Sequence, residues 1–187
     1  MKKTVFSAVL AATFGLVALQ ASASDGTITF TGDITDTTCT VTGGTGTDGA
    51  AQNVTVKLPN VSTTSLAAGQ TAGDTQFQLI IGASGQTGCT NGKIASLHFE
   101  PSQSPMVDAT TGNLKNSTAS GSATNVQVAV LNDKKAVINL NTSANSTQAT
   151  IANNTATLTY YGQYVATGGA ATAGTVNTNV VYSVAYN

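Results

Sequence analysis

Charged residues are scarce in this sequence, and arginine is absent altogether. Aspartate, glutamate and lysine make up 8% of the 187 residues, and every basic residue is a lysine. Two of the lysines, Lys2 and Lys3, precede an apolar N-terminal run, so few remain for the rest of the chain. A basic patch for nucleic acid, or a polybasic surface for membrane lipids, cannot be assembled from so few lysines. The composition therefore predicts no nucleic-acid partner and no electrostatic contact with a membrane.

Residues that could carry catalysis or hold a cofactor are equally scarce. The single histidine, His98, is flanked by Leu97 and Phe99 in a strand-like pattern, and no serine or cysteine arrangement accompanies it as a triad. The stretch "GTGTDG", from Gly44 to Gly49, matches the dinucleotide-binding pattern GxGxxG. It precedes a strand-like segment instead of opening a helix after a strand, so we expect a loop there. We expect no enzymatic activity, no cofactor and no metal.

The sequence has one long hydrophobic run, and that run is too short to cross a bilayer. It extends from Val5 to Leu19 and is followed by Ala21-Ser22-Ala23, the small-x-small form that signal peptidase cuts. A membrane span, the competing interpretation, needs about 20 apolar residues. We therefore expect residues 1–23 to be a removable signal peptide, with no membrane span after cleavage. The remaining chain, residues 24–187, has the size of one ordinary domain.

Cysteine is limited to Cys39 and Cys89. Pairs of cysteines in exported proteins are usually joined, so a disulfide is expected. In the loop-entropy model a bridge across this sequence separation contributes about 4 kcal/mol, less any strain in the native state. A metal site is the alternative, but it needs more ligands than one histidine and two cysteines supply.

Helical spacing is absent outside the signal peptide, and period-2 alternation of apolar and polar residues takes its place. With 41% hydrophobic residues and few prolines, the chain suits strands and turns better than a solvated coil. Residues 100–124 and 141–150 are polar and are interpreted as loops, in which short edge strands are possible. The alternating segments indicate an all-β sandwich or barrel; they are residues 53–58, 77–81, 96–99, 125–130, 136–140, 157–165 and 179–187.

Both ends of the mature chain carry an alternating segment. Chain ends are usually frayed unless something holds them, so two such strands raise the question of their partners. They could pair with each other or with their neighbours in an ordinary sandwich. The residues that share one side of the first segment are Ile28, Phe30, Gly32 and Ile34. Those that share one side of the last segment are Val176, Val180, Tyr182, Val184 and Tyr186.

Four fragments, in order behind the signal peptide, resemble the chaperone-usher pilins, and among them the major shaft subunit of type 1 fimbriae. The first is "GTITFTGDITDTTCTV", in which Gly32 precedes Cys39 by seven residues. The second is "LPNVSTTSLAAGQTAGDTQFQLII", which leads to Cys89. The third and fourth are "GSATNVQVAVLN" and "YYGQYVATGGAATAGTVNTNVVYSVAYN". The similarity covers essentially all of residues 24–187.

The end of the chain is similar to the C-terminal zipper motif of that family, because Tyr186 is the penultimate residue and Gly174 the fourteenth from the end. The sequence departs from the family in a longer stretch between its cysteines, with glycine-rich insertions at residues 43–50 and 82–88. This departure affects the expected loops and not the expected fold.

The resemblance implies an incomplete immunoglobulin-like β-sandwich that lacks its final strand and is completed by a donor strand from a neighbouring subunit. It implies a donor extension at residues 24–34 and a pilin domain at residues 35–187. Ile28, Phe30, Gly32 and Ile34 would then form the donor strand. The acceptor groove and zipper would include Gly174, Val180, Tyr182, Val184 and Tyr186.

The resemblance also implies a function and its partners. The chain would be a structural subunit of an adhesive pilus on the bacterial surface, exported through the periplasm. A periplasmic chaperone would cover its groove, and an outer-membrane usher would exchange the chaperone strand for that of the next subunit. One domain behind a donor strand suits a shaft subunit better than a tip adhesin or a terminator. The rival hypothesis is a secreted, self-contained binding module, for instance for carbohydrate, which an exposed aromatic cluster would favour.

Overall fold

The computed structural model describes residues 29, 31, 34, 36–49 and 52–187. The chain divides into two units, Met1–Ile34 and Thr35–Asn187. The expected signal peptide, and the predicted donor residues Ile28, Phe30 and Gly32, lie outside the described residues. Ile34, the fourth predicted donor residue, is fully exposed. Among the described residues, no helix is both long enough and apolar enough to span a membrane.

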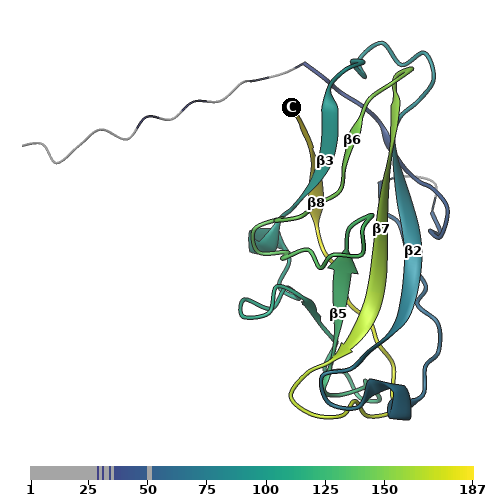
Figure 1. The fold of residues 1–187 in the computed structure, drawn as a ribbon, viewed down its shortest axis with the longest axis vertical. Coiled ribbons are helices and arrows are strands. Elements are labelled where there is room, and N and C mark those ends of the chain that lie inside the picture. The colour runs from purple at the N-terminus through teal and green to yellow at the C-terminus, as the bar shows by residue number, and fades with distance from the viewer. Residues whose placement is uncertain (1–28, 30, 32–33, 35, 50–51) are drawn as a thin grey trace, which may run out of the picture. The chain divides into compact units, whose positions relative to one another are not determined.

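The unit Thr35–Asn187 is built from two antiparallel sheets (Figure 1). The five-stranded sheet has the order β1-β2-β7-β5-β4, and the three-stranded sheet has the order β6-β3-β8. The strands are β1 (Val41–Gly43), β2 (Thr71–Gly82), β3 (Ile94–Phe99), β4 (Leu114–Lys115), β5 (Val126–Leu131), β6 (Gln148–Thr150), β7 (Thr155–Ala166) and β8 (Tyr182–Tyr186). The described part of the chain also contains two 3-10 helices, η1 (Thr63–Leu66) between β1 and β2 and η2 (Pro101–Gln103) between β3 and β4. The all-β prediction is confirmed.

The strands β2 and β7 form the longest ladder, and β7 also pairs with β5. The register of β2 shifts between Ala72 and Thr75, where Gly73 has a φ of 74°. A side chain at Gly73 would meet the ring of Tyr164, whose Cδ2 would lie 2.9 Å from an added Cβ. Glycine therefore permits this bulge in front of an aromatic ring.

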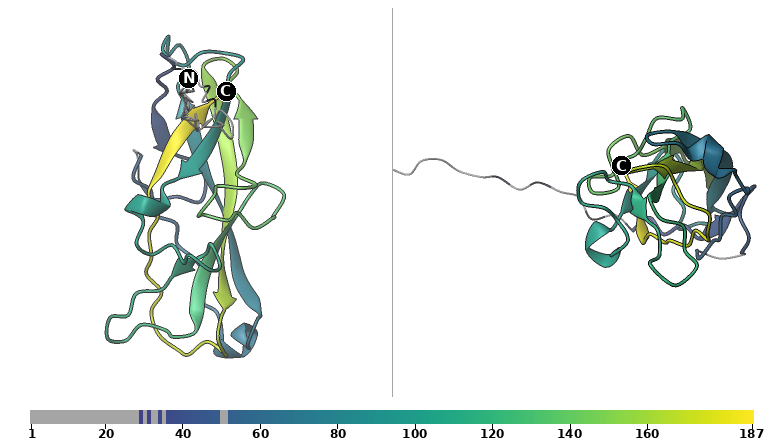
Figure 2. Two further views of the ribbon diagram at one scale, coloured as in Figure 1. Left: turned by 90° about the vertical axis from the view of Figure 1, so that its left-hand side faces the viewer. Right: turned by 90° about the horizontal axis from the view of Figure 1, so that it is seen from below.

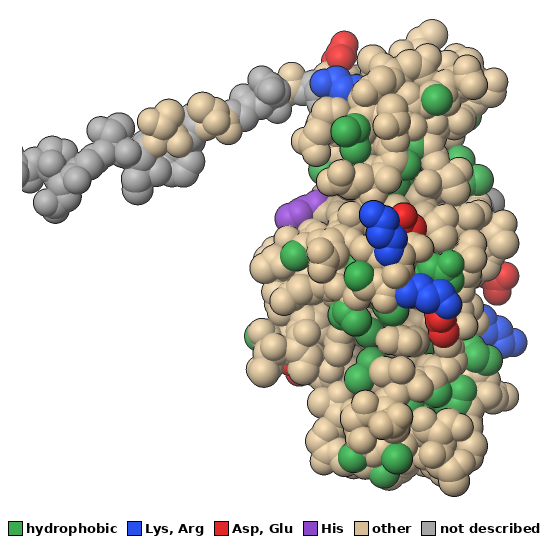
Figure 3. Space-filling model, viewed as in Figure 1, with side chains coloured by type: hydrophobic (Ala, Val, Ile, Leu, Met, Phe, Trp, Pro, Cys, Tyr) green, Lys and Arg blue, Asp and Glu red, His purple; other side chains and the backbone are tan. Residues whose placement is uncertain are grey.

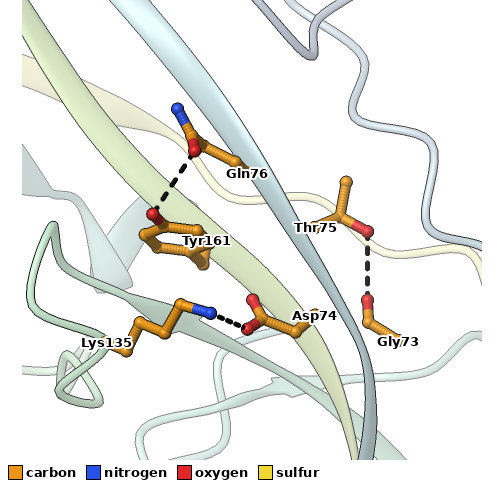
Figure 4. Close-up of polar contacts among 6 residues, drawn as sticks. All are labelled: Gly73, Asp74, Thr75, Gln76, Lys135 and Tyr161. Carbon is orange, nitrogen blue, oxygen red and sulfur yellow. Dashed lines mark hydrogen bonds and ion pairs between the residues drawn. The ribbon is translucent and has the colours of Figure 1, made fainter.

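Polar contacts hold the outer side of the bulge (Figure 4). Asp74 forms an ion pair with Lys135, whose ammonium also lies 4.8 Å from the centroid of the Tyr161 ring. The hydroxyl of Tyr161 donates to Gln76 Oε1 at 3.3 Å. Such exposed charges are few, and most of the face shown in Figure 3 consists of uncharged side chains and backbone.

The core lies between the two sheets, and Tyr160 of β7 is its largest fully buried side chain. Its ring stacks on Phe77 of β2 at 5.7 Å and meets Phe99 of β3 edge-on at 6.4 Å, so it joins residues of both sheets. Its hydroxyl forms a hydrogen bond with Ser146 Oγ at 3.2 Å. Burial raises the pKa of Tyr160 to about 12, because the phenolate would be desolvated there.

Cys39 and Cys89 form a disulfide with their Cα atoms 4.6 Å apart. The bridge ties the segment before β1 to the turn before β3, and Thr38 N donates to Gly88 O at 2.7 Å beside it. The glycine-rich stretch from Gly44 to Gly49, expected as a loop, forms a turn and an isolated bridge.

Two segments expected as strands do not belong to a ladder. Residues 136–140 form only isolated bridges, although the side chains of Ile138 and Leu140 are fully buried. Residues 53–58 form a single bridge, between Asp48 and Thr55. Alternation of apolar and polar residues predicts which side chains are buried. A ladder also needs a neighbouring strand at the right spacing. The polar stretches 100–124 and 141–150 contain the short strands β4 and β6.

Candidate functional site: a groove beside the C-terminal strand

A groove of about 790 Å3 lies between residues 52–58 and residues 176–182. Its floor consists of apolar side chains from β2, β3, β4, β5 and β7. These side chains are Phe77, Leu79, Leu97, Phe99, Leu114, Val128, Val130 and Tyr164. Most of them belong to the main hydrophobic core, so the groove opens directly onto the interior of the sandwich.

The C-terminal segment forms one wall, and its hydrogen bonds follow a strict alternation. Thr175 N donates to Gly121 O at 2.9 Å, Asn177 O accepts from Ser117 N at 3.0 Å, and Val181 O accepts from Glu100 N at 2.9 Å. The odd-numbered residues of this segment thus turn their main-chain groups toward β3 and the stretch before β5.

The even-numbered residues of the same wall turn their main-chain groups the other way, because N–H and C=O groups alternate sides along an extended chain. The main-chain groups of Val176, Thr178 and Val180 form no hydrogen bond with any described residue. Further along, β8, drawn in yellow in Figure 2, lies beside β3. Among the described strands β8 pairs with β3 alone, so its second edge is free. The free edge therefore extends over residues 176–186.

Residues 52–58 form the opposite wall. Val54, Val56 and Leu58 are half-buried and line the groove, whereas Thr55 and Lys57 between them are exposed. Thr55 exchanges two main-chain hydrogen bonds of 2.8 Å with Asp48 on the outer side. By the same alternation, the main-chain groups of Val54 and Val56 point away from Asp48. Both walls thus present main-chain groups that have no partner among the described residues, above an apolar floor.

The two walls are joined at one end by Tyr182, whose hydroxyl donates to Gln52 O at 2.6 Å. Burial raises the pKa of Tyr182 and of Tyr186, because ionisation would place a charge beside apolar neighbours. A second cavity of about 620 Å3 continues the groove at the other end, since both cavities share Leu58, Tyr164 and Val176.

The predicted groove residues fall in different places. Val180 and Tyr182 line the main groove, and Gly174 lines its continuation. A side chain at Gly174 would clash with the backbone of Ser122 and Ala123, so this position requires a glycine. Val184 and Tyr186 are half-buried in β8 and pack against the main core.

The sequence did not predict that residues 52–58 form a wall of the groove. The alternation of Val54, Val56 and Leu58 was visible in the sequence, but it predicted an ordinary paired strand. Of the other residues considered, His98 is exposed on β3. Within the described part of the chain, no three metal-ligating side chains come together.

An extended polypeptide has the features that this groove can recognise. Its main-chain N–H and C=O groups can pair with the free edges of both walls, and alternate apolar side chains can fill the space above the floor. A compact small molecule would leave most of the unpaired main-chain groups without partners.

Comparisons with known proteins find similar sequences among fimbrial proteins. The family model for Type-1 fimbrial protein, A, matches residues 58–187. The F17 fimbrial protein of Escherichia coli is 42% identical and aligns over 91% of this chain and 94% of its own length. The major fimbrial subunit SMF-1 of Stenotrophomonas maltophilia is 40% identical, over 90% of this chain and 96% of its own.

Solved structures show the same fold at low sequence identity. A chaperone-usher pilus structure matches with a TM-score of 0.53 and 18% identity, and covers 88% of this chain and 96% of that one. The P pilus rod subunit PapA matches with a TM-score of 0.51 and 17% identity, over 87% of this chain and 99% of its own.

Proposed function

This chain belongs to the type-1 fimbrial protein family, and on that premise we propose that its subunits join by strand insertion. As a member of that family it is a structural subunit of an extracellular surface fimbria and polymerises with other subunits. In the proposed contact, residues 24–34 of one subunit enter the groove between residues 52–58 and 176–182 of the next.

One observation carries this proposal: two extended walls of the groove offer free main-chain groups above a floor that belongs to the hydrophobic core. An exposed apolar edge of this kind would favour aggregation if nothing covered it. A strand added between the walls would pair with both edges and cover the floor in one step. The immunoglobulin-like sandwich would then be complete.

The sequence of the N-terminal extension fits such a groove. Ile28, Phe30 and Ile34 alternate with polar residues and with Gly32, so an extended conformation places them on one side. Each large side chain would contribute on the order of 1.5 to 3 kcal/mol when fully buried. The stretch from residue 28 to residue 34 has the same length as the wall from residue 176 to residue 182, so the two can lie side by side along the groove.

The same groove needs a cover before the subunits meet. We assign that role to a strand lent by a periplasmic chaperone, with exchange for the next subunit at an outer-membrane usher, after cleavage of residues 1–23 and export to the periplasm. The repeated contact joins two different surfaces of the subunit, and such heterologous contacts produce open filaments. This role is structural and requires no catalysis.

The decisive test is the substitution Phe30→Asp in the full-length chain, with Thr31→Asp as the matched control. A carboxylate at position 30 would be buried without a partner after insertion, at a cost of several kcal/mol. The same charge at position 31 would face away from the groove in an extended strand. We expect Phe30→Asp cells to contain subunit bound to its chaperone but to display no filaments, and Thr31→Asp cells to display filaments.

Two outcomes would contradict this proposal. Normal filaments from Phe30→Asp would show that residue 30 does not enter a groove. Loss of both filaments and chaperone-bound subunit would place Phe30 in the core of its own domain. Quantifying the periplasmic complex and the sheared surface filaments from the same cultures separates these results.

A further inference from the structure

A polar residue interrupts the apolar row that the C-terminal segment turns toward the groove. Val176 and Val180 line the groove, and Thr178 lies between them in the same lining. The flanking residues Asn177 and Asn179 are exposed, as expected for the opposite face of an extended segment. Thr178 therefore places a hydroxyl group in a row that otherwise consists of valines and tyrosines.

The hydroxyl of Thr178 is buried and has no hydrogen-bond partner among the described residues. The buried hydroxyl of Ser104, which lies beside this wall, has a partner: Ser104 Oγ accepts from Val181 N at 2.9 Å. The second unpaired buried atom in the described part, Asn113 Oδ1, belongs to an amide whose nitrogen donates to Gln127 Oε1 at 3.3 Å. Burying a hydroxyl without a partner costs free energy, which a valine of similar shape would avoid.

On the basis of the strand insertion proposed above, we propose that Thr178 is a specificity-determining residue of the groove. Its hydroxyl forms a hydrogen bond with the main chain of the inserted strand. The main-chain groups of Thr178 lie at the free edge, so the inserted backbone passes beside this residue. A threonine hydroxyl can donate to a C=O group of that backbone or accept from an N–H group.

This contact selects a strand with a small residue at the position opposite Thr178. In the apolar row from Ile28 to Ile34, Gly32 is the position without a side chain, between Phe30 and Ile34. Glycine allows close approach of another group to the backbone. In a strand shifted by two residues, the large side chain of Phe30 or Ile34 would face the hydroxyl and leave it buried without a partner. Thr178 and Gly32 together therefore fix the register of insertion.

The experiment compares filaments made from the full-length variants Thr178→Val, Thr178→Ser and Thr157→Val. Thr157 is an exposed residue of β7 and controls for the exchange of threonine for valine. The measured quantity is the rate at which purified filaments release subunits in guanidinium chloride. We expect release from Thr178→Val filaments to be about tenfold faster than from wild type, whereas Thr178→Ser and Thr157→Val stay within about twofold.

Several outcomes would overturn the proposed role of the Thr178 hydroxyl. Thr178→Val filaments that release subunits at the wild-type rate, or more slowly, would show that the hydroxyl has no partner in the filament. Equal weakening by valine and serine would assign the effect to shape and would overturn the hydrogen bond. If Thr178→Val yields no filaments while Thr178→Ser yields normal ones, the hydroxyl is needed for insertion itself, as proposed; loss of filaments in both would overturn it.

The pairing with Gly32 has its own measurement. If the hydroxyl meets the main chain at Gly32, the effects of Gly32→Ala and Thr178→Val on the release rate will not add, because each removes the same contact. Additive effects would overturn the assignment of Gly32. None of these outcomes depends on the Phe30→Asp result, so strand insertion can hold while the role of Thr178 fails.

Discussion

The strand β7 and the segment 176–186 both contribute alternate side chains to the core, but their edges differ. β7 lies between β2 and β5, so both of its edges are paired within one chain. Residues 176–186 are paired on one side, by β3 and by the main-chain N–H groups of Glu100 and Ser117. The side chains of β7 facing the core are almost all buried, whereas those of β8 are only half-buried.

This contrast separates two roles of an alternating segment. In β7 the alternation stabilises the subunit itself, because its neighbours bury Leu158 and Tyr160 completely. In the C-terminal segment the same alternation leaves a free edge and a groove, which in the proposed function are covered by another molecule. Substitutions in the two regions should therefore affect different measurements: the free energy of unfolding for β7, and the joining of subunits for the groove.

Two effects of similar size are expected to be the largest, and the first comes from the disulfide, which links the segment preceding β1 to the turn preceding β3. Replacing both Cys39 and Cys89 by alanine removes a link between residues 50 apart in sequence. We expect a loss of about 4 kcal/mol in the free energy of unfolding, measured by urea denaturation of the purified subunit. Wild type under reducing conditions should match the double variant, and a loss below about 1 kcal/mol would contradict this expectation.

A matched pair of truncations tests the contrast directly. Leu158→Ala should cost about 2 to 5 kcal/mol in the free energy of unfolding, because it opens a cavity in the paired core. Val180→Ala should cost about 1 kcal/mol or less, because that side chain is only half-buried in the subunit.

In filaments we expect the opposite order. Val180→Ala should increase the dissociation of subunits more than Leu158→Ala does, although its effect on the free energy of unfolding is smaller. Urea denaturation of subunits and dissociation of filaments give the two quantities. If the effect on filament dissociation, divided by the effect on the free energy of unfolding, is the same in both variants, the groove is an ordinary part of the core.

Alkaline pH should destabilise the paired region through Tyr160. Its pKa is about 12 in the folded state, whereas an unfolded tyrosine has its ordinary value of 10. The unfolded chain therefore loses this proton first. The free energy of unfolding falls by about 3 kcal/mol in total as the pH rises from 10 to 12. In Tyr160→Phe this part of the decrease should be absent. The check is the free energy of unfolding of wild type and Tyr160→Phe, measured at pH 9 and at pH 11.5. Equal decreases in the two proteins would show that groups other than Tyr160 cause the effect.

The smallest effect is expected at the exposed contacts of the β2 bulge. Lys135→Ala removes the ion pair with Asp74 and the contact with the Tyr161 ring, all on the outer surface of the five-stranded sheet. Exposed ion pairs contribute little, because water and salt screen them. We expect the thermal unfolding midpoint to change by an amount near the limit of detection, and filament assembly to be unaffected. A large decrease in assembly would move the site of subunit contact to this surface.

Much of the fold could be predicted from local pattern. The segments around Phe77, Val128 and Tyr160 form strands where the alternation predicted them, because each has neighbours in the same chain that bury one face. The prediction was wrong at Ile138, which is fully buried although its segment forms no ladder. It was also wrong at Val54, where the neighbouring strand that would complete a ladder is missing from the described part of the chain.

The sequence by itself determined the all-β class, the two cysteines available for a bridge, and the apolar rows at both ends of the chain. These properties depend on composition and on the two-residue period of an extended backbone, which are local. Only the tertiary structure decided that residues 54–58 and 176–182 face each other across an open floor, and that the hydroxyl of Thr178 lies buried there without a partner among the described residues. The pairing of strand edges and the burial of a single side chain depend on residues far apart in sequence, so no local pattern contains them.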